Sequence, residues 1–211
     1  MIDLALALLR DELNEYIRSI PGNNDPVYVT LGNVSAIEGS NNNSLNDTIL
    51  VSLVNIEEES TLKNLRTPPR MIGNRMVYDS APAHLNLYIL FACNFPDDYN
   101  NALIRLSQVI QRFQSKKVFN LQNTVSDTVL AIAADPNDPR HDLVRLLSLA
   151  LDLYTMTFEQ INHLWGSLGG KQIPFGMYKV RLVELAEPKV DREAPPIEQI
   201  RQDVHPLNEA C

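Results

Sequence analysis

The sequence predicts a single α/β domain in which helices flank one mixed β-sheet, and three observations lead to this fold class. The chain has 211 residues, which fits one domain on a scale of roughly 100–200 residues per domain. Hydrophobic residues make up 45% of the chain and charged residues 21%, as in an average soluble protein, so disorder is excluded as the main state. Helical and strand periodicities alternate along the chain, and we therefore expect the strands to share one sheet.

The first quarter of the chain predicts a helix followed by strands. Over residues 2–20, apolar side chains recur at spacings of three and four, and a proline–glycine pair then ends the helix. Residues 27–31 alternate between apolar and polar, which is typical of a strand. After a polar loop at 39–47, residues 49–56 are apolar at both odd and even positions, except for Ser52 and Asn55. This second strand is therefore expected in the centre of the sheet, with both faces covered.

The middle of the chain predicts a further strand and a second helix. Residues 84–92 alternate as a strand does, and the stretch before them, 60–82, reads as a loop with a short strand near 75–78. Acidic residues after Pro96 suit the positive start of a helix that continues to about Ser115. Its predicted buried stripe consists of four apolar residues: Leu103, Leu106, Ile110 and Phe113.

The last third contains the best-marked helix. Thr157 to Gln160 form a capping box, Met156 and Ile161 can form a hydrophobic staple, and Gly169-Gly170 provide a C-terminal stop. Strands are expected around this helix, at 118–119, 129–133, 147–154 and 177–185.

The prediction divides the chain into a domain, residues 1–186, and an acidic, proline-containing tail, residues 187–211. Proline cannot donate to a sheet ladder, so the tail is not expected to extend the sheet of the domain. Apolar residues at helical spacing predict a short amphipathic helix over 197–207. Because a helix of about three turns is marginal in water, we expect it to gain order only by docking; a disordered terminus is the alternative.

Composition and charge exclude several classes of partner. The chain carries 18 basic and 26 acidic residues, a net charge of −8, and no basic run longer than two residues, which argues against a nucleic-acid partner. No stretch reaches the roughly 18 apolar residues of a membrane span. Cys93 and Cys211 lie far apart and are expected to be free thiols in a reducing compartment. The chain start lacks the features of a signal peptide, so we expect synthesis in the cytoplasm.

A search for catalytic and ligand-binding patterns predicts no metal, no cofactor and no catalytic residue. The four histidines (His84, His141, His163 and His205) lie on different elements without metal-ligand spacing. The loop from Asp135 to Asp142 lacks the order of a calcium loop. Phosphate-binding and nucleophile motifs are not found. An enzyme acting through Asp135, Asp138 and His141, or through the glutamates at 57–59, is kept as a third hypothesis, which alanine substitution without loss of assembly would support.

Two features are predicted to form interfaces. Glu57, Glu58 and Glu59 are adjacent at the end of a strand, an arrangement more typical of a solvated rim or a charged contact patch than of paired catalytic carboxylates. Trp165 lies on the apolar stripe of the capped helix. We expect it to be a core residue or, if the domain folds without it, an interface anchor.

Several blocks in the same order along residues 1–185 resemble a known family. They are Leu53–Glu59 with Thr61–Asn64, His84–Tyr88, blocks within Ala102–Phe119, Leu164–Gly170 with Pro174, and Tyr178–Val183. Together they resemble a bacterial family first described as a domain of unknown function. That family forms the N-terminal part of the tail terminator, or cap, of extracellular contractile injection systems of the antifeeding-prophage and virulence-cassette type.

The resemblance implies a fold like that of phage tail terminators and a structural function. It implies a homo-hexameric ring that closes the distal end of the inner tube and the sheath and ends tail growth. The implied partners are further copies of the chain and the tube and sheath proteins, within a particle that can be released from the cell. The polar loops at 39–47 and 60–75 are expected to make contacts. The alternative is a non-enzymatic adaptor, or a cargo- or ligand-binding module, of such a particle.

Overall fold

The computed structural model divides the chain into two compact units, which are described separately. The first consists of Met1–Lys63 and Ala83–Leu185, and the second of residues 64–82 and 186–211. The second unit thus combines residues of the predicted tail with a segment from the middle of the chain. The division into a domain, residues 1–186, and a tail, residues 187–211, stays a prediction. The structure describes residues 1–21, 28–39, 45–59, 70–72, 75–79, 83–185 and 190–194.

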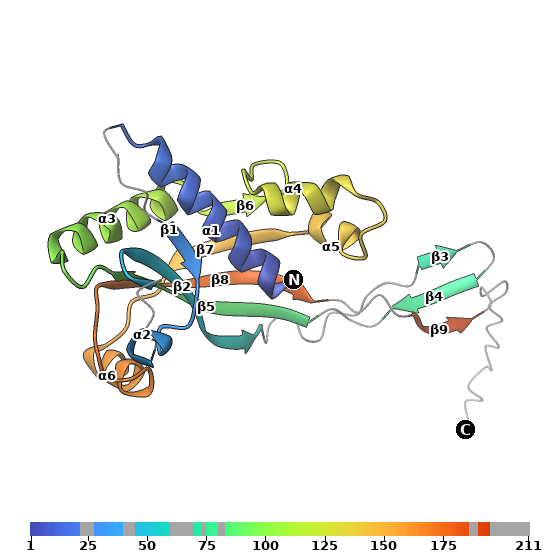
Figure 1. Cartoon of the computed structure of the whole chain (residues 1–211). Helices are drawn as coiled ribbons and strands as arrows, with labels where there is room; N and C mark the ends of the chain where they lie inside the picture. Colours follow the sequence, from blue (N-terminus) through green and yellow to red (C-terminus); the bar gives the residue numbers. More distant parts are fainter. Residues whose placement is uncertain are drawn as a thin grey trace, which may run out of the picture. The chain divides into compact units, whose positions relative to one another are not determined.

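The first unit is built on one six-stranded mixed sheet (Figure 1), as the sequence predicts. Its strand order is β1-β2-β5-β8-β7-β6. The outer pair β1–β2 is parallel, and all other neighbours in the sheet are antiparallel. The strands are β1 (Tyr28–Leu31), β2 (Thr48–Glu58), β5 (Ala83–Asn94), β6 (Val118–Asn120), β7 (Ser148–Leu153) and β8 (Phe175–Leu185).

Helices cover both faces of this sheet, but unequally (Figure 1). We call the face covered by α1 the α1 face and the opposite face, covered by α6, the α6 face. Four helices contribute to the core of the α1 face and two to that of the α6 face. The first four are α1 (Ile2–Ser19), α3 (Tyr99–Ser115), α4 (Asp127–Ala134) and α5 (His141–Arg145). The other two are α2 (Ala36–Gly39) and α6 (Phe158–Ser167).

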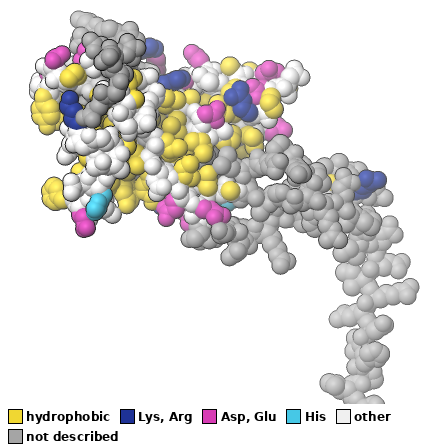
Figure 2. All heavy atoms as spheres, turned by 60° about the horizontal axis from the view of Figure 1, so that its bottom comes forward, with side chains coloured by type: hydrophobic (Ala, Val, Ile, Leu, Met, Phe, Trp, Pro, Cys, Tyr) yellow, Lys and Arg dark blue, Asp and Glu magenta, His cyan; other side chains and the backbone are white. Residues whose placement is uncertain are grey.

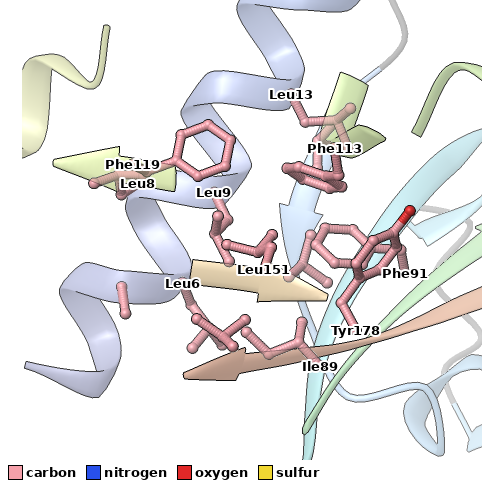
Figure 3. Close-up of a cluster of buried hydrophobic side chains, with 14 of the residues drawn as sticks. Leu6, Leu8, Leu9, Leu13, Ile89, Phe91, Phe113, Phe119, Leu151 and Tyr178 are labelled. Atoms are coloured by element: carbon pink, nitrogen blue, oxygen red, sulfur yellow. The ribbon is translucent and has the colours of Figure 1, made fainter. Parts of the chain in front are cut away.

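The core of the α1 face is a dense aromatic and aliphatic cluster (Figure 3). Phe113 of α3 lies at its centre, with ring centroids 4.9 Å from Phe91, 6.0 Å from Phe119 and 5.2 Å from Tyr178. Leucines of α1 pack against the same cluster. Each such ring pair contributes roughly 0.5–1.5 kcal/mol beyond the burial of its area, so this cluster is a major source of stability.

A buried carboxylate links α1 to distant parts of the same face. Glu12 is fully buried; its Oε2 accepts hydrogen bonds from Arg112 Nη2 at 2.6 Å and Lys116 Nζ at 3.0 Å. Its Oε1 accepts a hydrogen bond from the backbone N–H of Val125 at 2.8 Å. Burial by itself raises the pKa of Glu12, but the Val125 N–H and the two cations outweigh it and lower the pKa below its ordinary value.

At each edge of the sheet, an asparagine side chain forms hydrogen bonds with backbone groups that point away from the neighbouring strand. At β1, Asn14 accepts a hydrogen bond from Val29 N at 2.9 Å and donates one to Val29 O at 3.2 Å. At β6, Asn123 accepts from Asn120 N at 3.0 Å and donates to Val118 O at 3.1 Å. Unpaired edge groups are templates for added strands, so these two amides hinder strand addition there.

Most predicted elements of this unit are confirmed, and four expectations need correction. Residues 129–133 form part of helix α4, not a strand, because the Ser126 side chain caps a helix that buries Val129 and Ile132. The short helices α2 and α5 were not expected. The buried stripe of α3 runs through Ala102, Arg105, Val109 and Phe113, whereas Leu103 and Ile110 are 41% and 38% exposed. Strand β2 is central, but it is buried only over its first half.

The second unit contains a small antiparallel sheet of three strands. They are β3 (Arg70–Ile72), β4 (Arg75–Asp79) and β9 (Val190–Ala194), in the order β3-β4-β9. The short strand predicted near 75–78 is thereby confirmed, while β3 and β9 were not expected. Strand β9 belongs to the predicted tail and pairs with β4. The predicted helix over 197–207, and most of the two polar loops, lie outside the described residues.

Candidate assembly interface

An open groove of about 550 Å³ lies on the α6 face of the six-stranded sheet. Its floor comes from strands and from the segment before α6, through Val54, Tyr88, Tyr154 and Met156, and α6 forms one wall through residues such as Leu164. Figure 2, which brings the lower side of Figure 1 forward, shows hydrophobic side chains gathered on this face with acidic side chains near its edge. A partly apolar, open groove of this kind is suited to contact with another protein.

A β-bulge in β2 places Glu57 at the groove. Before the bulge, Val51 and Leu53 pack on the α1 face. The pairing of β2 with β5 then shifts between Leu53 and Asn55, and Glu57 pairs with Asn86. Because successive side chains of a strand alternate between faces, regular pairing would have put Glu57 on the same face as Leu53. The extra residue moves it to the α6 face.

Glu57 is a firmly anionic group at this groove. Its Oε2 accepts a hydrogen bond from Tyr88 Oη at 2.7 Å, and Lys179 Nζ lies 3.5 Å away. These contacts, the tyrosine hydroxyl first, lower the pKa of the Glu57 carboxyl, and the same hydrogen bond raises the pKa of Tyr88. The Tyr88 ring is fixed in turn by an edge contact with Tyr154, with centroids 5.1 Å apart.

The three predicted interface glutamates have different surroundings. Glu58 is exposed, and alternation along the strand points it away from the face of Glu57. Glu59 is half-buried, and its Oε2 accepts a hydrogen bond from Asn86 Nδ2 at 2.8 Å. Glu57 and Glu59 thus accept hydrogen bonds from two different neutral side chains, Tyr88 and Asn86 respectively.

Trp165 anchors the helix that forms the groove wall. The helix begins with the predicted capping box, in which Thr157 Oγ1 accepts from Gln160 N at 3.3 Å and Gln160 Oε1 accepts from Thr157 N at 3.0 Å. It ends before Gly169 and Gly170, whose φ angles of 115° and 86° favour glycine. Trp165 is 4% exposed and packs on Phe175 with ring centroids 5.3 Å apart. Its position is that of a core residue that supports the groove without lining it.

The described histidines lie on separate elements, whereas Asp135, Asp138 and His141 share one turn, in which Asp138 N donates to Asp135 O at 3.1 Å and His141 N donates to Asp138 O at 2.9 Å. His84 lies on β5, His141 begins α5 and His163 is exposed on α6, while His205 lies outside the described residues. Asp138 pairs with Arg140, whose hydrogen bonds lower the pKa of that carboxyl. Among the residues that the structure describes, no group of three or more His, Cys, Asp or Glu could hold a metal ion.

No described helix is both long and apolar enough to cross a membrane.

The fold matches that of tube-terminating proteins. The chain is similar to the sheath/tube terminator of PVC, an extracellular contractile injection system, in its extended state, with 13% identity and a TM-score of 0.57 over 100% of this chain and 65% of that one. It is also similar to the tube-terminating cap of the anti-feeding prophage, with 12% identity and a TM-score of 0.62 over 97% of this chain and 61% of that one. This chain therefore spans less than two thirds of either protein.

The family can be stated as well. The model of the Pvc16 N-terminal domain matches residues 5–199, and the chain belongs to this family. Both the resemblance and the tail-terminator-like fold predicted from the sequence are thereby confirmed. No curated protein matches the sequence.

The groove itself was not foreseen from the sequence. It depends on Tyr88 of β5, on Tyr154 in the segment between β7 and α6, and on the bulge before Glu57. The one available signal was the alternation of residues 84–92, which places Tyr88 on the face opposite Leu87. The roles of Glu57, Glu58, Glu59 and Trp165 at an interface stay predictions.

Proposed function

We propose that this chain is a subunit of the terminator cap of a contractile injection particle, forming a homo-hexameric ring that closes the inner tube and sheath and stops tail growth. One observation carries the proposal: the chain matches the Pvc16 N-terminal domain over residues 5–199, and its fold follows two tube-terminating proteins along 97% or more of its length. The function is structural and non-enzymatic, and the chain is assembled in the cytoplasm into a particle that leaves the cell.

The site agrees with a protein that acts by contact. A cap needs surfaces for neighbouring subunits, tube and sheath, and no reacting group. The groove with its apolar floor and anionic Glu57 is one such surface, and we assign it to the tube or sheath protein. Interface cores combine apolar contact with a polar rim. This groove has an apolar floor and the anionic Glu57, beside the helix that Trp165 anchors.

The position of the chain in the particle tests this function. Particles are produced with an epitope-labelled chain and, separately, without the chain, and are imaged by electron microscopy. We expect the label at one tip only, six copies in the tip density, and tails of uncontrolled length when the chain is missing. Label along the sheath or at the baseplate, or unchanged tail length without the chain, would contradict the proposal.

The groove also favours one second candidate, an adaptor that holds an apolar segment of another particle protein. The same images separate the two functions, because an adaptor does not limit tail length. A particle with the label at any other place and with normal tails would indicate the adaptor.

A further inference from the structure

The outward face of α3 carries no charged side chain. The two charged residues of this helix are turned into the domain: Arg105 is 4% exposed, and Arg112 bonds to Glu12. A solvated helix face normally carries charge, and depletion of charge marks the core of protein interfaces. The exposed residues of α3 are Tyr99, Asn100, Leu103, Ile104, Ser107, Ile110, Gln111, Gln114 and Ser115.

The start of this face opens into a groove of about 450 Å³. The groove lies between the first turns of α3, with Tyr99 and Leu103, and the segment Gln172–Phe175. All of its lining residues are uncharged. Tyr99 is 66% exposed, so a large aromatic ring at the edge of the groove has most of its surface in solvent. Such a surface gains by contact with an apolar side chain.

The most exposed large apolar side chain of the described residues is Phe158, at 92%. It is the first residue of α6, directly after the N-cap Thr157, and the capping box fixes the backbone at this point. An exposed phenylalanine on a rigid helix start loses little conformational freedom on binding, as is typical of interface anchors. Glu159 follows Phe158, and the exposed Lys171 precedes Gln172 at the groove. The exposed acids Asp97 and Asp98 precede Tyr99 on the other side of the groove, where Asp98 caps α3 by accepting a hydrogen bond from Asn101 N at 2.9 Å.

Strand addition is a poor alternative for association of this unit. The outward groups of Val29 at one edge, and those of Val118 and Asn120 at the other, are bonded to Asn14 and Asn123. We therefore expect copies of this unit to meet mainly through side chains. A protrusion and a groove at different places on one chain fit a head-to-tail contact, which closes into a ring when the rotation permits.

We propose that Phe158 of one copy inserts into the groove formed by Tyr99, Leu103 and Pro174 of the next copy, with Glu159 facing Lys171 across the contact. The proposal rests on the homo-oligomeric ring of the proposed function and names the surfaces that build it. The occupant of the groove is thus a second copy of this chain.

Disulfide trapping tests the contact in assembled particles. Cys211 is replaced by serine, and Cys93 can stay because it is buried and burial raises the pKa of its thiol to about 12. A tagged chain carrying Phe158→Cys is expressed together with an untagged chain carrying Gln172→Cys, and the particles are oxidised. We expect cross-links between the two chain types, and a ladder that ends at six when both cysteines are on one chain. Dimers only between identical variants, or no cross-link in particles that contain the chain, would overturn the proposal.

Substitutions quantify the same contact in the purified chain, by light scattering over a concentration series. Phe158→Asp should weaken self-association about tenfold or more, as loss of an interface anchor does. Leu146→Asp, at another exposed apolar residue, is the matched control and should have no effect. Glu159→Lys and Lys171→Glu should each weaken association, and the double variant should restore it. If the double variant is as weak as the singles, the assigned pairing is wrong.

The trapping and the imaging of the label fail independently. A ladder in particles whose label lies away from the tip would keep the contact and reject the cap. A labelled tip without 158–172 cross-links would keep the cap and reject the contact.

Discussion

The two faces of the six-stranded sheet serve different purposes. On the α1 face, four helices cover the sheet, and the aromatic cluster around Phe113 and the carboxylate of Glu12 are buried. On the α6 face, the smaller cluster around Trp165 supports one longer helix, and a groove of about 550 Å³ stays open beside it. One face is therefore mainly a folding core, and the other combines a small core with an open groove, which we propose as a surface for a partner.

The difference teaches how one sheet can supply both stability and a contact surface. Buried area on the α1 face stabilises the domain by itself, so the α6 face can leave apolar side chains such as Tyr88 and Tyr154 partly uncovered. If this comparison is right, substitutions in either core should lower stability. Substitutions at the groove should affect assembly and leave stability unchanged.

The largest effect is expected for Trp165→Ala. Truncation of a buried tryptophan costs roughly 3–5 kcal/mol, a large part of a typical total of about 5–15 kcal/mol. Urea denaturation should show this loss, and the variant should be poorly soluble. Phe158→Ala, on the same helix but 92% exposed, is the matched control and should keep the unfolding midpoint. A Trp165→Ala chain that unfolds normally but does not join the particle would instead make Trp165 an interface anchor.

A smaller loss, about 2–3 kcal/mol near neutral pH, is expected for Glu12→Gln. Loss of one partner of a buried ion pair costs about 3–5 kcal/mol, and Arg112 and Lys116 keep about a fifth of their surface in solvent, which reduces the cost. Because the pKa of Glu12 is lowered by folding, its stabilisation is present above its ordinary value of 4.5 and disappears as pH falls through the folded pKa.

The pH dependence of the difference between the two proteins checks this role of Glu12. Urea midpoints of wild type and Glu12→Gln should differ clearly at pH 7 and converge below the folded pKa. A difference in urea midpoint that stays constant down to pH 2.5 would show that lost packing, not the charge, is responsible. Titration of the other acidic residues affects both proteins alike and therefore cancels in this difference.

The smallest effect on stability is expected when Glu57, Glu58 and Glu59 are all replaced by lysine. Glu57 and Glu58 are exposed, so the thermal midpoint should change little, while incorporation into particles should drop sharply. A triple variant with lysine at Glu15, Asp127 and Asp142 carries the same change of charge on exposed residues elsewhere and is the control. Normal tail length and incorporation in the Glu57–Glu59 variant would remove these residues from the interface.

Much of the fold and the family could be predicted from the sequence, because the decisive signals are local. The Thr157–Gln160 capping box and the two glycines after α6 act within a few residues, and the structure confirms both. Strand alternation in 84–92 predicted which side chains of β5 enter which core. Local patterns failed where one segment suits two structures: residues 129–133 are all apolar and include the β-branched Val129 and Ile132, yet the cap at Ser126 begins a helix there.

What the sequence by itself determined is most of the longer helices and strands of the first unit, with approximate ends, and the family resemblance. Only the tertiary structure decided which surfaces these elements present. The bulge that turns Glu57 toward the groove arises from pairing with a strand about 30 residues away, and Glu12 meets Arg112 and Val125 across about 100 residues or more. Such contacts depend on partners that are close only after folding. No pattern within a few residues of Glu57 or Glu12 specifies them.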